Sequence, residues 1–486
     1  MRAFLLHSNE PGLEALLDGL RIPHGHKPPD GLTGRPRLIY WGAYHPDKGD
    51  ADALQPVKSI LAVQQPQRLH ELLRLHGLHA ADPDVSATAE ARGVKERENW
   101  SHEYMVPVFQ LQALTLFHRP GSTVFYGGEG AAGAPVRSRR ENSYTEVGLE
   151  QPGYYAARAI RTAVRSIYAL GLDYGVVRIG VRADATLAVR DVEPVPKLTP
   201  RLTQLFAEAI NRLDRSLELE AARRDPPEVM LGADPEFLLM TEQGNVKFAS
   251  EFVGKDGPFG CDSIVLPSRR KIFPLAELRP VPSTDVRELV GHLHRTMQLA
   301  ARRITDTELT WVAGGMPVPG FPLGGHIHFS GVELDPQLLR VLDNYVALPL
   351  TLLEDATTVE RKPQYGFLGD FRRQRHGGFE YRVLPSWMVS PSVAKGVLAL
   401  AKLTAEHYKL LKRRPLADYE VVKAYYSSDK ARIRPFVPAL WNDLEKLPGY
   451  AKLESYLLPL RRMMLQMRSW NEREDIRPKW KIAPFV

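Results

Sequence analysis

Four short segments in the second half of the chain each carry two chemically active side chains separated by a single residue. The pairs are Asp234/Glu236, Glu277/Arg279, His326/His328 and Glu380/Arg382. In an extended strand residues i and i+2 project to the same face. Each segment is therefore expected to present both of its active groups on one side. Four such strands in one sheet predict a face covered by carboxylate, imidazole and guanidinium groups.

Carboxylates and imidazoles at this density repel or titrate one another unless a cation lies among them. An oxygen-rich set with few imidazoles suits Mg²⁺ or Mn²⁺. Two glycine pairs, Gly324–Gly325 and Gly377–Gly378, precede two of the segments and allow a ligand to approach the backbone closely. We interpret the pattern as a metal–nucleotide site. The alternative is a solvated face of antiparallel strands, but such faces usually carry Lys, Thr, Ser and Gln.

Length and composition narrow the class of protein. At 486 residues, with 44% hydrophobic and 25% charged residues, the chain predicts a soluble globular protein of two or three domains. It contains no apolar stretch of the roughly 20 residues that a membrane span needs, and its start does not have the pattern of a secretory signal. We therefore expect a cytoplasmic protein without membrane association. The single cysteine, Cys261, excludes an internal disulfide and a cysteine-rich zinc site.

The net charge of +7 and the pI near 9.2 raise the question of nucleic-acid binding. The basic residues are scattered, and no nucleic-acid-binding motif connects them. The short runs Arg137–Arg140 and Lys412–Arg414 read as solvated charges. We expect no nucleic-acid partner, and the excess charge instead suits small anions such as ATP or an acidic polymer.

A domain boundary is expected at residues 223–228, where an amphipathic helix over Pro200–Arg223 meets Pro226–Pro227, which cannot continue it. This predicts domains 1–224 and 225–486. For the first domain we expect, in order, a strand Leu38–Trp41, a helix Gln67–His76, a strand Met105–Phe117, a glycine-rich loop Gly127–Gly133, a helix Tyr154–Leu170 and a hairpin Gly175–Val181/Thr186–Val192. For the second we expect a strand Met230–Met240 and helices Thr284–Ile304, Pro336–Asp355, Ser392–Lys412 and Gly449–Met467.

Three motifs in the second half of the chain carry a family resemblance: GADPEF, GGHIHFS and FRRQRHGGFEYRVLPS. In this order, over about Leu231–Leu410, the chain resembles the glutamine synthetase and glutamate–cysteine ligase superfamily of carboxylate–amine ligases, and especially its phage-type COOH–NH2 ligase branch. Asp234 stands where that pattern normally has Glu. The resemblance implies an α+β fold in which an antiparallel glutamine-synthetase-like sheet is flanked by helices.

The resemblance also implies roles for individual residues. Asp234, His326 and Glu380 would hold one divalent ion beside the ATP phosphates. Glu236 and Glu277 would hold a second ion, with Asp262 or Glu251 completing its shell. His328 and Ser330 would lie along the nucleotide, and Arg372, Arg373 or Arg375 would grip ATP or a substrate carboxylate. Arg382 would stabilise the transferred phosphoryl group, and catalysis is expected to rest on Arg382, Glu277 and Glu380.

The first half of the chain resembles the ATP-grasp proteins of the spore-coat-associated type, on the stretch AIRTAVRSIYALGLDYGVVRIGVRADATLAVRDVEPVPKLTP. This implies an α/β ATP-grasp-like domain in which Asp191 and Glu193 coordinate Mg²⁺. Arg178 stands where that family has an aspartate, and it would compete with a cation for the same space. The alternative is a degenerate domain that binds a substrate or a partner.

Together these observations predict an ATP- and Mg²⁺-dependent ligase that joins the carboxylate of an amino acid or peptide to an amine through an acyl phosphate. Phosphoryl transfer gives the carboxylate a leaving group, two metal ions neutralise the developing charge, and arginines match phosphate oxygens. Two alternatives stay open: a guanidino or amine kinase of the same architecture, and a non-catalytic scaffold of the spore-coat type. The sequence is compatible with a homo-oligomer and leaves the substrates open.

Overall fold

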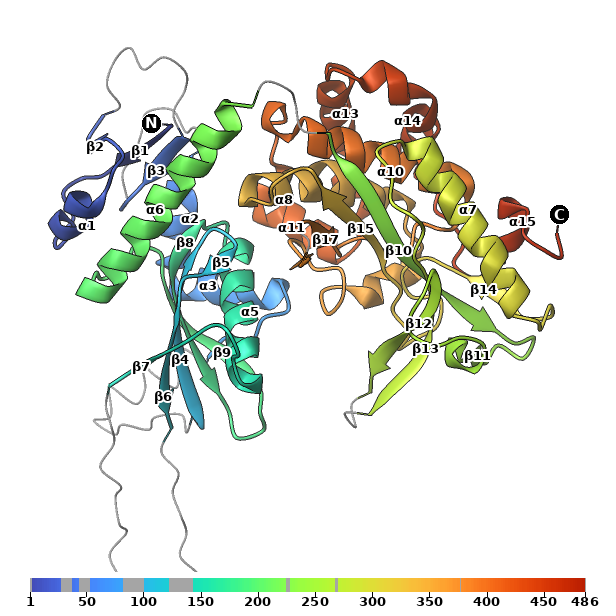
Figure 1. Cartoon of the computed structure of the whole chain (residues 1–486), viewed down its shortest axis with the longest axis horizontal. Helices are drawn as coiled ribbons and strands as arrows, with labels where there is room; N and C mark the ends of the chain where they lie inside the picture. The colour runs from blue at the N-terminus through green and yellow to red at the C-terminus, as the bar shows by residue number, and fades with distance from the viewer. Residues whose placement is uncertain are drawn as a thin grey trace, which may run out of the picture. The chain divides into compact units, whose positions relative to one another are not determined.

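The computed structural model describes residues 2–27, 37–42, 53–81, 100–121, 143–223, 228–266, 270–375 and 377–485. The chain divides into two compact units, Met1–Arg224 and Asp225–Val486 (Figure 1). The predicted glycine-rich loop Gly127–Gly133, the basic run Arg137–Arg140 and the proline pair Pro226–Pro227 lie outside the described residues. Among the described helices, none combines the length and the apolar character that a membrane crossing requires.

The C-terminal unit is built on an antiparallel sheet with the strand order β12–β13–β10–β15–β17–β16, and β11 and β14 pair with β10. The long central strand β10 spans Met230–Met240, the range predicted from its alternating pattern. Its other elements are β11 (Val246–Lys247), β12 (Phe259–Val265), β13 (Lys271–Leu278), α7 (Val286–Arg303), β14 (Thr310–Val312), β15 (Gly325–Ser330), α8 (Pro336–Leu342), α9 (Leu348–Leu350), β16 (Phe371–Arg373), β17 (Phe379–Tyr381), α10 (Pro391–Glu406), α11 (Tyr419–Tyr426), α12 (Lys430–Ile433), α13 (Val437–Glu445), α14 (Tyr450–Leu465) and α15 (Arg477–Trp480).

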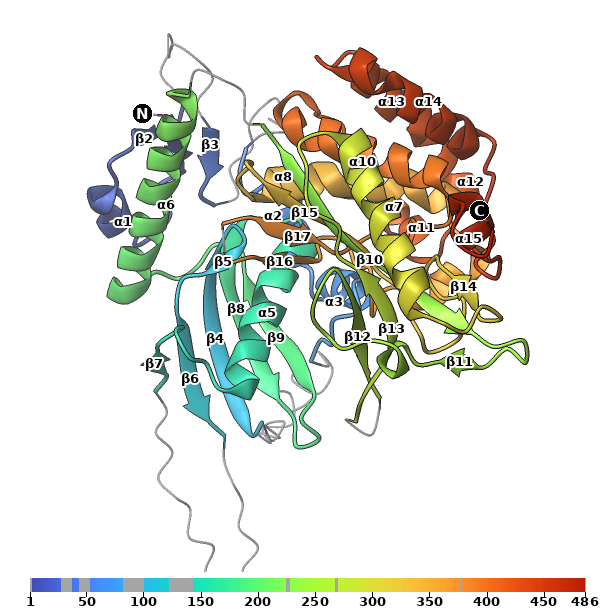
Figure 2. The ribbon, with the colours of Figure 1, turned by 45° about the vertical axis from the view of Figure 1, so that its right-hand side comes forward.

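The two faces of this sheet differ in chemistry because side chains alternate along each strand. Ile327 and Tyr381, the residues between the active ones on β15 and β17, are fully buried. The Tyr381 hydroxyl donates a hydrogen bond to Asp343 Oδ1 at 2.7 Å in the segment that follows α8. The helix α7 packs on β10, β12 and β13 and lies beside α10 (Figure 2). The helices thus cover the apolar face, and the active side chains fall on the other.

Local capping explains where the main helices of this unit begin. Asp285, Asp335 and Ser390 each accept a hydrogen bond at the helix N-terminus from a backbone N–H three residues later. The predicted helix Pro336–Asp355 is interrupted, since a π-helical turn over Asp343–Ala347 and short helical pieces follow α8. The predicted helix Ser392–Lys412 is shorter in the structure, because α10 ends at Glu406.

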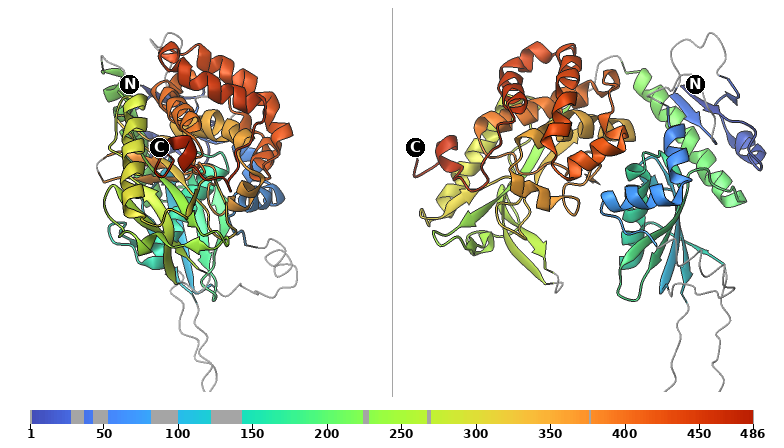
Figure 3. Two further views of the ribbon diagram at one scale, coloured as in Figure 1. Left: turned by 90° about the vertical axis from the view of Figure 1, so that its right-hand side faces the viewer. Right: turned by 180° about the vertical axis from the view of Figure 1, so that it is seen from behind.

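The N-terminal unit holds a parallel sheet of order β2–β1–β3 and an antiparallel sheet of order β7–β6–β4–β8–β9. One core lies between the larger sheet and α5 with α3, and a second joins α6 to the smaller sheet (Figure 3). Its elements are β1 (Ala3–Leu6), α1 (Glu14–Gly19), β2 (His24–Gly25), β3 (Arg37–Tyr40), α2 (Val57–Val63), α3 (Pro66–Leu75), β4 (His102–Phe109), β5 (Gln112–Ala113), β6 (Leu116–Pro120), β7 (Thr145–Val147), α5 (Tyr154–Ala169), β8 (Tyr174–Val181), β9 (Leu187–Glu193) and α6 (Pro200–Ala221).

The predicted single strand Met105–Phe117 is wrong. The chain turns after β4 at Gln110, whose φ of 55° lies in the left-handed region, and β6 returns antiparallel to β4. The turn sequence FQLQ has no Gly, Pro, Asn or Asp, the residues that normally mark a turn. An apolar run without such a marker reads as one long strand. The mixed helix-and-sheet class is confirmed, while the glutamine-synthetase and ATP-grasp assignments stay predictions.

Candidate functional site

The strand register of the C-terminal sheet places the predicted active residues in one row across neighbouring strands. The facing pairs are Glu277 and Glu236, Asp234 and His326, His328 and Glu380, and Glu380 and Arg372. Residues that are up to about 150 positions apart in the sequence therefore share one face. The row runs from β13 through β10, β15 and β17 to β16.

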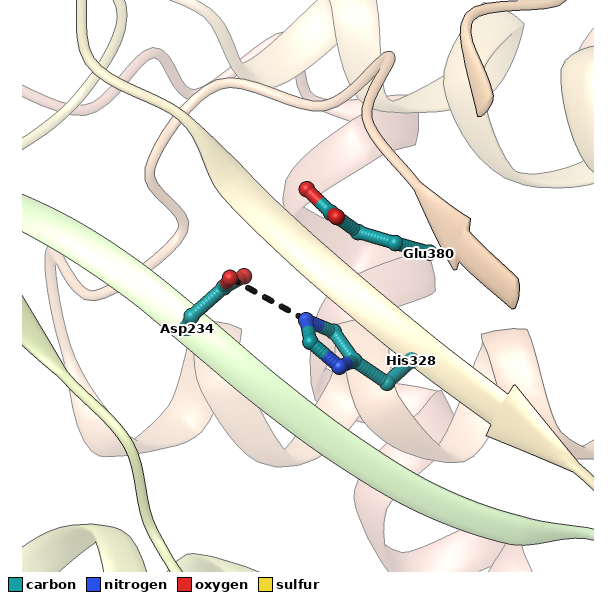
Figure 4. Close-up of side chains that lie close together, drawn as sticks. All are labelled: Asp234, His328 and Glu380. Atoms are coloured by element: carbon teal, nitrogen blue, oxygen red, sulfur yellow. Dashed lines mark ion pairs between the residues drawn. The ribbon is translucent and has the colours of Figure 1, made fainter. Parts of the chain in front are cut away.

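Three of these side chains converge on one point. Asp234, His328 and Glu380 each offer a ligand atom, and these atoms lie within 4.8 Å of one another (Figure 4). His328 Nε2 is 3.1 Å from Asp234 Oδ2. Asp234 Oδ1, His328 Nε2 and Glu380 Oε1 are buried and have no well-aligned hydrogen bond within the described chain. Two carboxylates and one imidazole with such atoms are a donor set that fits Mg²⁺ or Mn²⁺.

His326 lies between the two carboxylates of this cluster. Its Nδ1 is 3.3 Å from both Asp234 Oδ1 and Glu380 Oε1, and the residue is 7% exposed. Burial alone would lower the pKa of His326, but the Asp234 carboxylate outweighs burial and raises that pKa to about 9. Burial also opposes ionisation of Asp234, yet His326 and His328 hold the pKa of Asp234 well below its usual value. Both histidines thus lie close to the Asp234 carboxylate. The ligand atom that converges with those of Asp234 and Glu380 belongs to His328, whereas the sequence predicted His326 in that role and His328 along the nucleotide.

Glu236 and Glu277 form a second acidic position beside the first. Burial raises the pKa of Glu236 to about 7, and burial together with Asp234 raises the pKa of Glu277 to about 9. Glu236 Oε2 accepts a hydrogen bond from Gly324 N at 2.6 Å, and Glu277 accepts one from Arg279. Carboxyl groups whose pKa values rise through burial beside other acids are stabilised in their charged form by a cation.

Asp262 and Glu251 were the two residues predicted to complete the shell of the second ion, and they differ in position. The charge of Asp262 contributes to the raised pKa of both Glu236 and Glu277, after burial and other charges. Glu251 instead forms an ion pair with Lys247, and its side chain is half exposed. Asp262 is therefore the residue that the structure brings toward the pair.

The predicted arginines fall into two groups. Arg382 Nε lies 3.1 Å from Glu380 Oε1, and Arg372 Nη1 lies 3.2 Å from Glu380 Oε2. Burial opposes the charge of Arg382, but Asp370 and Glu380 raise the pKa of its guanidinium above the usual value. Arg373 instead donates toward the Leu334 carbonyl at 3.5 Å.

The remaining two predicted residues lie at the margins of the row. Arg375 is exposed in the turn that follows β16, and Ser330 ends β15 opposite Met230. Ser330 shares its strand face with the two histidines. In the part of the chain that the structure describes, neither residue forms a hydrogen bond or ion pair with the acidic cluster, so their predicted roles stay predictions.

Two residues at the site were missed in the sequence. Gln374 Nε2 donates to Glu380 Oε2 at 3.1 Å, and Ser386 Oγ donates to the Glu236 carbonyl at 2.5 Å. Gln374 stands two positions after Arg372, so the same i+2 rule that identified the pairs would have found it. Ser386 has no such local signal, because its partner lies on a distant strand.

A buried carboxylate near the end of the chain supports the segments around the site. Glu472 is 1% exposed. It accepts hydrogen bonds from Gly315 N at 2.5 Å, Met316 N at 2.8 Å, Thr357 Oγ1 at 2.9 Å, Thr358 Oγ1 at 2.6 Å and Trp470 Nε1 at 3.1 Å. Ser386 N in turn donates to the Gly314 carbonyl at 2.8 Å. Glu472 thus fixes the loop before β15 to the segment that contacts Glu236.

The acids predicted in the N-terminal unit, Asp191 and Glu193, are both bound to one internal arginine. Arg178 Nη1 is 2.7 Å from Asp191 Oδ2, and Arg178 Nη2 is 2.5 Å from Glu193 Oε1. The strand register explains this contact, since Arg178 on β8 faces Asp191 on β9. The guanidinium therefore lies between the two carboxylates.

Comparison with known proteins gives one family match. Residues 231–482, just over half of the chain, match the model of the family described as phage phiEco32-like COOH.NH2 ligase-type 2. The match covers every strand that contributes to the row of active residues in the C-terminal sheet. No curated protein matches the chain.

Solved structures show distant likenesses to ligases. The ATP-grasp ligase PsnB complexed with minimal precursor is 12% identical over 45% of this chain and 99% of that chain, with a TM-score of 0.29. The D-alanine–D-alanine ligase from Bacillus anthracis complexed with ATP is 12% identical over 45% and 97%, with a TM-score of 0.28. A bifunctional glutathione synthetase from Pasteurella multocida is 11% identical over 52% and 48%, with a TM-score of 0.31. TM-scores below 0.5 do not establish a shared fold.

Proposed function

We propose that this chain, which belongs to the phage phiEco32-like COOH.NH2 ligase-type 2 family, forms an amide bond between a carboxylate and an amine at the expense of ATP. The observation that carries the proposal is the buried convergence of Asp234, His328 and Glu380 within the region that matches the family. Buried polar atoms are normally hydrogen-bonded. Each of the three residues carries a buried atom without a well-aligned hydrogen bond, and together with their convergence this favours a bound cation over a purely structural cluster.

The residues present fit a divalent cation at two positions. Asp234, His328 and Glu380 would hold one Mg²⁺ or Mn²⁺ ion, with His326 beside it, and Glu236 and Glu277 would hold a second ion near Asp262. When bound, such ions neutralise phosphate charge and orient the phosphates for in-line displacement. Burial, to which the charges of neighbouring acids add, raises the pKa values of Glu236 and Glu277 and supports the second position. We propose that two ions bind and that the reaction depends on Mg²⁺ or Mn²⁺.

We propose that the reaction proceeds through an acyl phosphate. An oxygen of the substrate carboxylate attacks the γ-phosphorus of ATP, the bond from phosphorus to the β–γ bridging oxygen breaks, and ADP leaves. The amine then attacks the acyl carbon, inorganic phosphate leaves with the bonding electron pair, and the nitrogen loses a proton. Arg382 and Arg372 stand at the cluster with guanidinium groups that match phosphate or carboxylate oxygens. A carboxylate near the amine would take this proton.

The finer assignments belong to the same proposal. The antiparallel C-terminal sheet would be of the glutamine synthetase type, and the N-terminal unit, residues 1–224, would be a divergent ATP-grasp-like domain. The substrates would be amino acids or peptides. His328 and Ser330 would lie along the nucleotide, with Arg373 and Arg375 near its path.

The experiment is Mg²⁺-dependent ADP formation by the full chain against pools of amino acids, small peptides and amines, with Glu380→Ala as the test variant. Glu420→Gln is the matched control, because Glu420 forms an exposed ion pair with Arg432 away from the sheet. Substrate-stimulated ADP release that is lost in Glu380→Ala, with an amide found by mass spectrometry, supports the ligase. A phosphorylated amine or guanidine without an amide would show a kinase. No ADP from any pool would favour a scaffold.

A further inference from the structure

The N-terminal unit contains a small cavity in which acidic and basic side chains meet. It has a volume of about 360 Å³ and is lined by Gln64, Arg178, Asp191, Glu193 and Lys197, together with Val192, Pro194 and Val195. All of these residues belong to one unit. The cavity therefore does not depend on the C-terminal site.

An internal cation already fills the space between its two acids. Arg178 makes one contact of 2.7 Å to Asp191 and one of 2.5 Å to Glu193. Burial opposes the charge, but Glu193 and Asp191 raise the pKa of Arg178 above its usual value. The guanidinium is therefore charged over the whole physiological range. A divalent ion would have to displace it and leave a half-buried arginine without its partners.

The other charges of the cavity are available to a ligand. The side chain of Asp191 is 47% exposed, and two carboxylates share a single guanidinium, so one negative charge is left over. Lys197 supplies a positive charge to the lining, and its ammonium makes no ion pair with any residue that the structure describes. The two carboxylates and the two basic side chains of the lining balance in formal charge, so the cavity offers a ligand one acidic and one basic position and no net attraction for a polyanion such as ATP.

We propose that this cavity binds a zwitterionic ligand, an α-amino acid or the free end of a short peptide, and not a metal ion. The ammonium group of the ligand lies at the exposed carboxylate of Asp191, since Glu193 already accepts from Arg178 at one oxygen and from Lys197 N at the other. Its carboxylate lies at Lys197, and the Gln64 amide offers a further polar contact. The volume suits one or two residues of a peptide. This proposal goes beyond the ligase activity and does not require it.

The binding experiment is equilibrium dialysis of the full chain against the twenty amino acids and diglycine. Diglycine is also tested with its amine acetylated and with its carboxylate amidated. We expect at least one zwitterion to bind, with an affinity that falls about tenfold or more on removal of either ligand charge and in Lys197→Gln and Asp191→Asn. Glu71→Gln on α3, from an exposed pair with Arg68, is the control. Absence of binding, or binding that is indifferent to Lys197 and Asp191, overturns the proposal.

A metal titration gives an independent result. Mn²⁺ bound by the wild-type chain, counted by electron paramagnetic resonance, is expected to be unchanged by Asp191→Asn. Arg178→Gln is expected to add one Mn²⁺, because it removes the internal cation and leaves both acids. Loss of bound Mn²⁺ from the wild type on Asp191→Asn would show a metal site and overturn the proposal. These outcomes do not depend on ADP formation, so a failure here is distinguishable from a failure of the proposed ligase.

Discussion

The two units each contain a group of acids that the sequence marks as metal ligands, and the two groups differ in what lies between the carboxylates. In the C-terminal sheet Asp234, His328 and Glu380 converge, and the imidazole of His326 lies between the two carboxylates. In the N-terminal sheet Asp191 and Glu193 are joined through Arg178. Acids that share one face of a sheet are thus not in themselves a metal site. What differs is the internal partner, because an arginine keeps its charge, whereas a histidine such as His326 can lose its proton and leave the carboxylates to a metal ion.

The largest expected effect is on metal affinity at the C-terminal cluster. Glu380→Gln keeps the shape of the side chain but removes a charged ligand from a residue that is 1% exposed. We expect Mn²⁺ affinity to fall by more than the about 10- to 100-fold that loss of an outer-shell partner causes. Titration calorimetry checks this against Glu420→Gln. An unchanged Mn²⁺ affinity would show that Glu380 is not a metal ligand.

The next effect concerns the positive charge that His326 places between two buried carboxylates. In His326→Ala these carboxylates lose their shared partner, which typically costs about 3–5 kcal/mol. We expect that loss in the free energy of unfolding of the C-terminal unit without metal, measured by chemical denaturation. Added Mn²⁺ should restore much of it by binding the folded state. Destabilisation that Mn²⁺ does not relieve would contradict a cation site beside His326.

A smaller effect is expected at Glu472, which supports the site without belonging to it. In Glu472→Gln one acceptor oxygen becomes an NH₂ group that faces donors such as Gly315 N. An unsatisfied buried donor costs about 1–3 kcal/mol, so we expect a loss of that size in the stability of the C-terminal unit. Mn²⁺ affinity should fall less than in Glu380→Gln. Equal stability of the variant and the wild type would show that the hydrogen bonds of Glu472 are not needed.

The smallest effect concerns the stability of the N-terminal unit at low pH, which depends on His76 and not on Asp191 and Glu193. Burial lowers the pKa of His76 to about 3, and Arg165 adds to that shift. Because the folded pKa lies below the unfolded value of about 6.5, the unit is stabilised above pH 6.5 and loses stability as the pH falls toward 3. At pH 5 the loss is about 2 kcal/mol. Unfolding measured at pH 7 and pH 5 should show this loss in the wild type and a smaller one in His76→Phe.

The sequence predicts which side chains share one face of the C-terminal sheet better than it predicts the elements around them, for physical reasons. On β10 and β15 the i+2 pattern depends only on strand geometry, so Asp234 and His328 are identified from spacing alone. The register that makes the His328 ligand atom converge with those of Asp234 and Glu380 depends on pairing between distant strands. Gln374 follows the same i+2 rule as Arg372, so the sequence could have indicated it.

Other features have no local signal at all. Glu472 is linked to Gly315 across 157 residues, and no pattern near either residue indicates the other. The turn at Gln110 lacks the residues that favour positive φ, so the apolar run around it predicts one strand where the structure has a hairpin. Arg178 was expected to compete with a cation because it stands where the resembled family has an aspartate, and the strand register places it opposite Asp191, which it contacts.

The most direct test of the central claim is the position of bound Mn²⁺ in crystals of the full chain grown with Mn²⁺ and a non-hydrolysable ATP analogue. Anomalous scattering locates the ion without reference to activity. We predict a peak coordinated by Asp234, His328 and Glu380 and no peak between Asp191 and Glu193. A peak at Asp191 and Glu193, with none at the C-terminal sheet, would contradict the account.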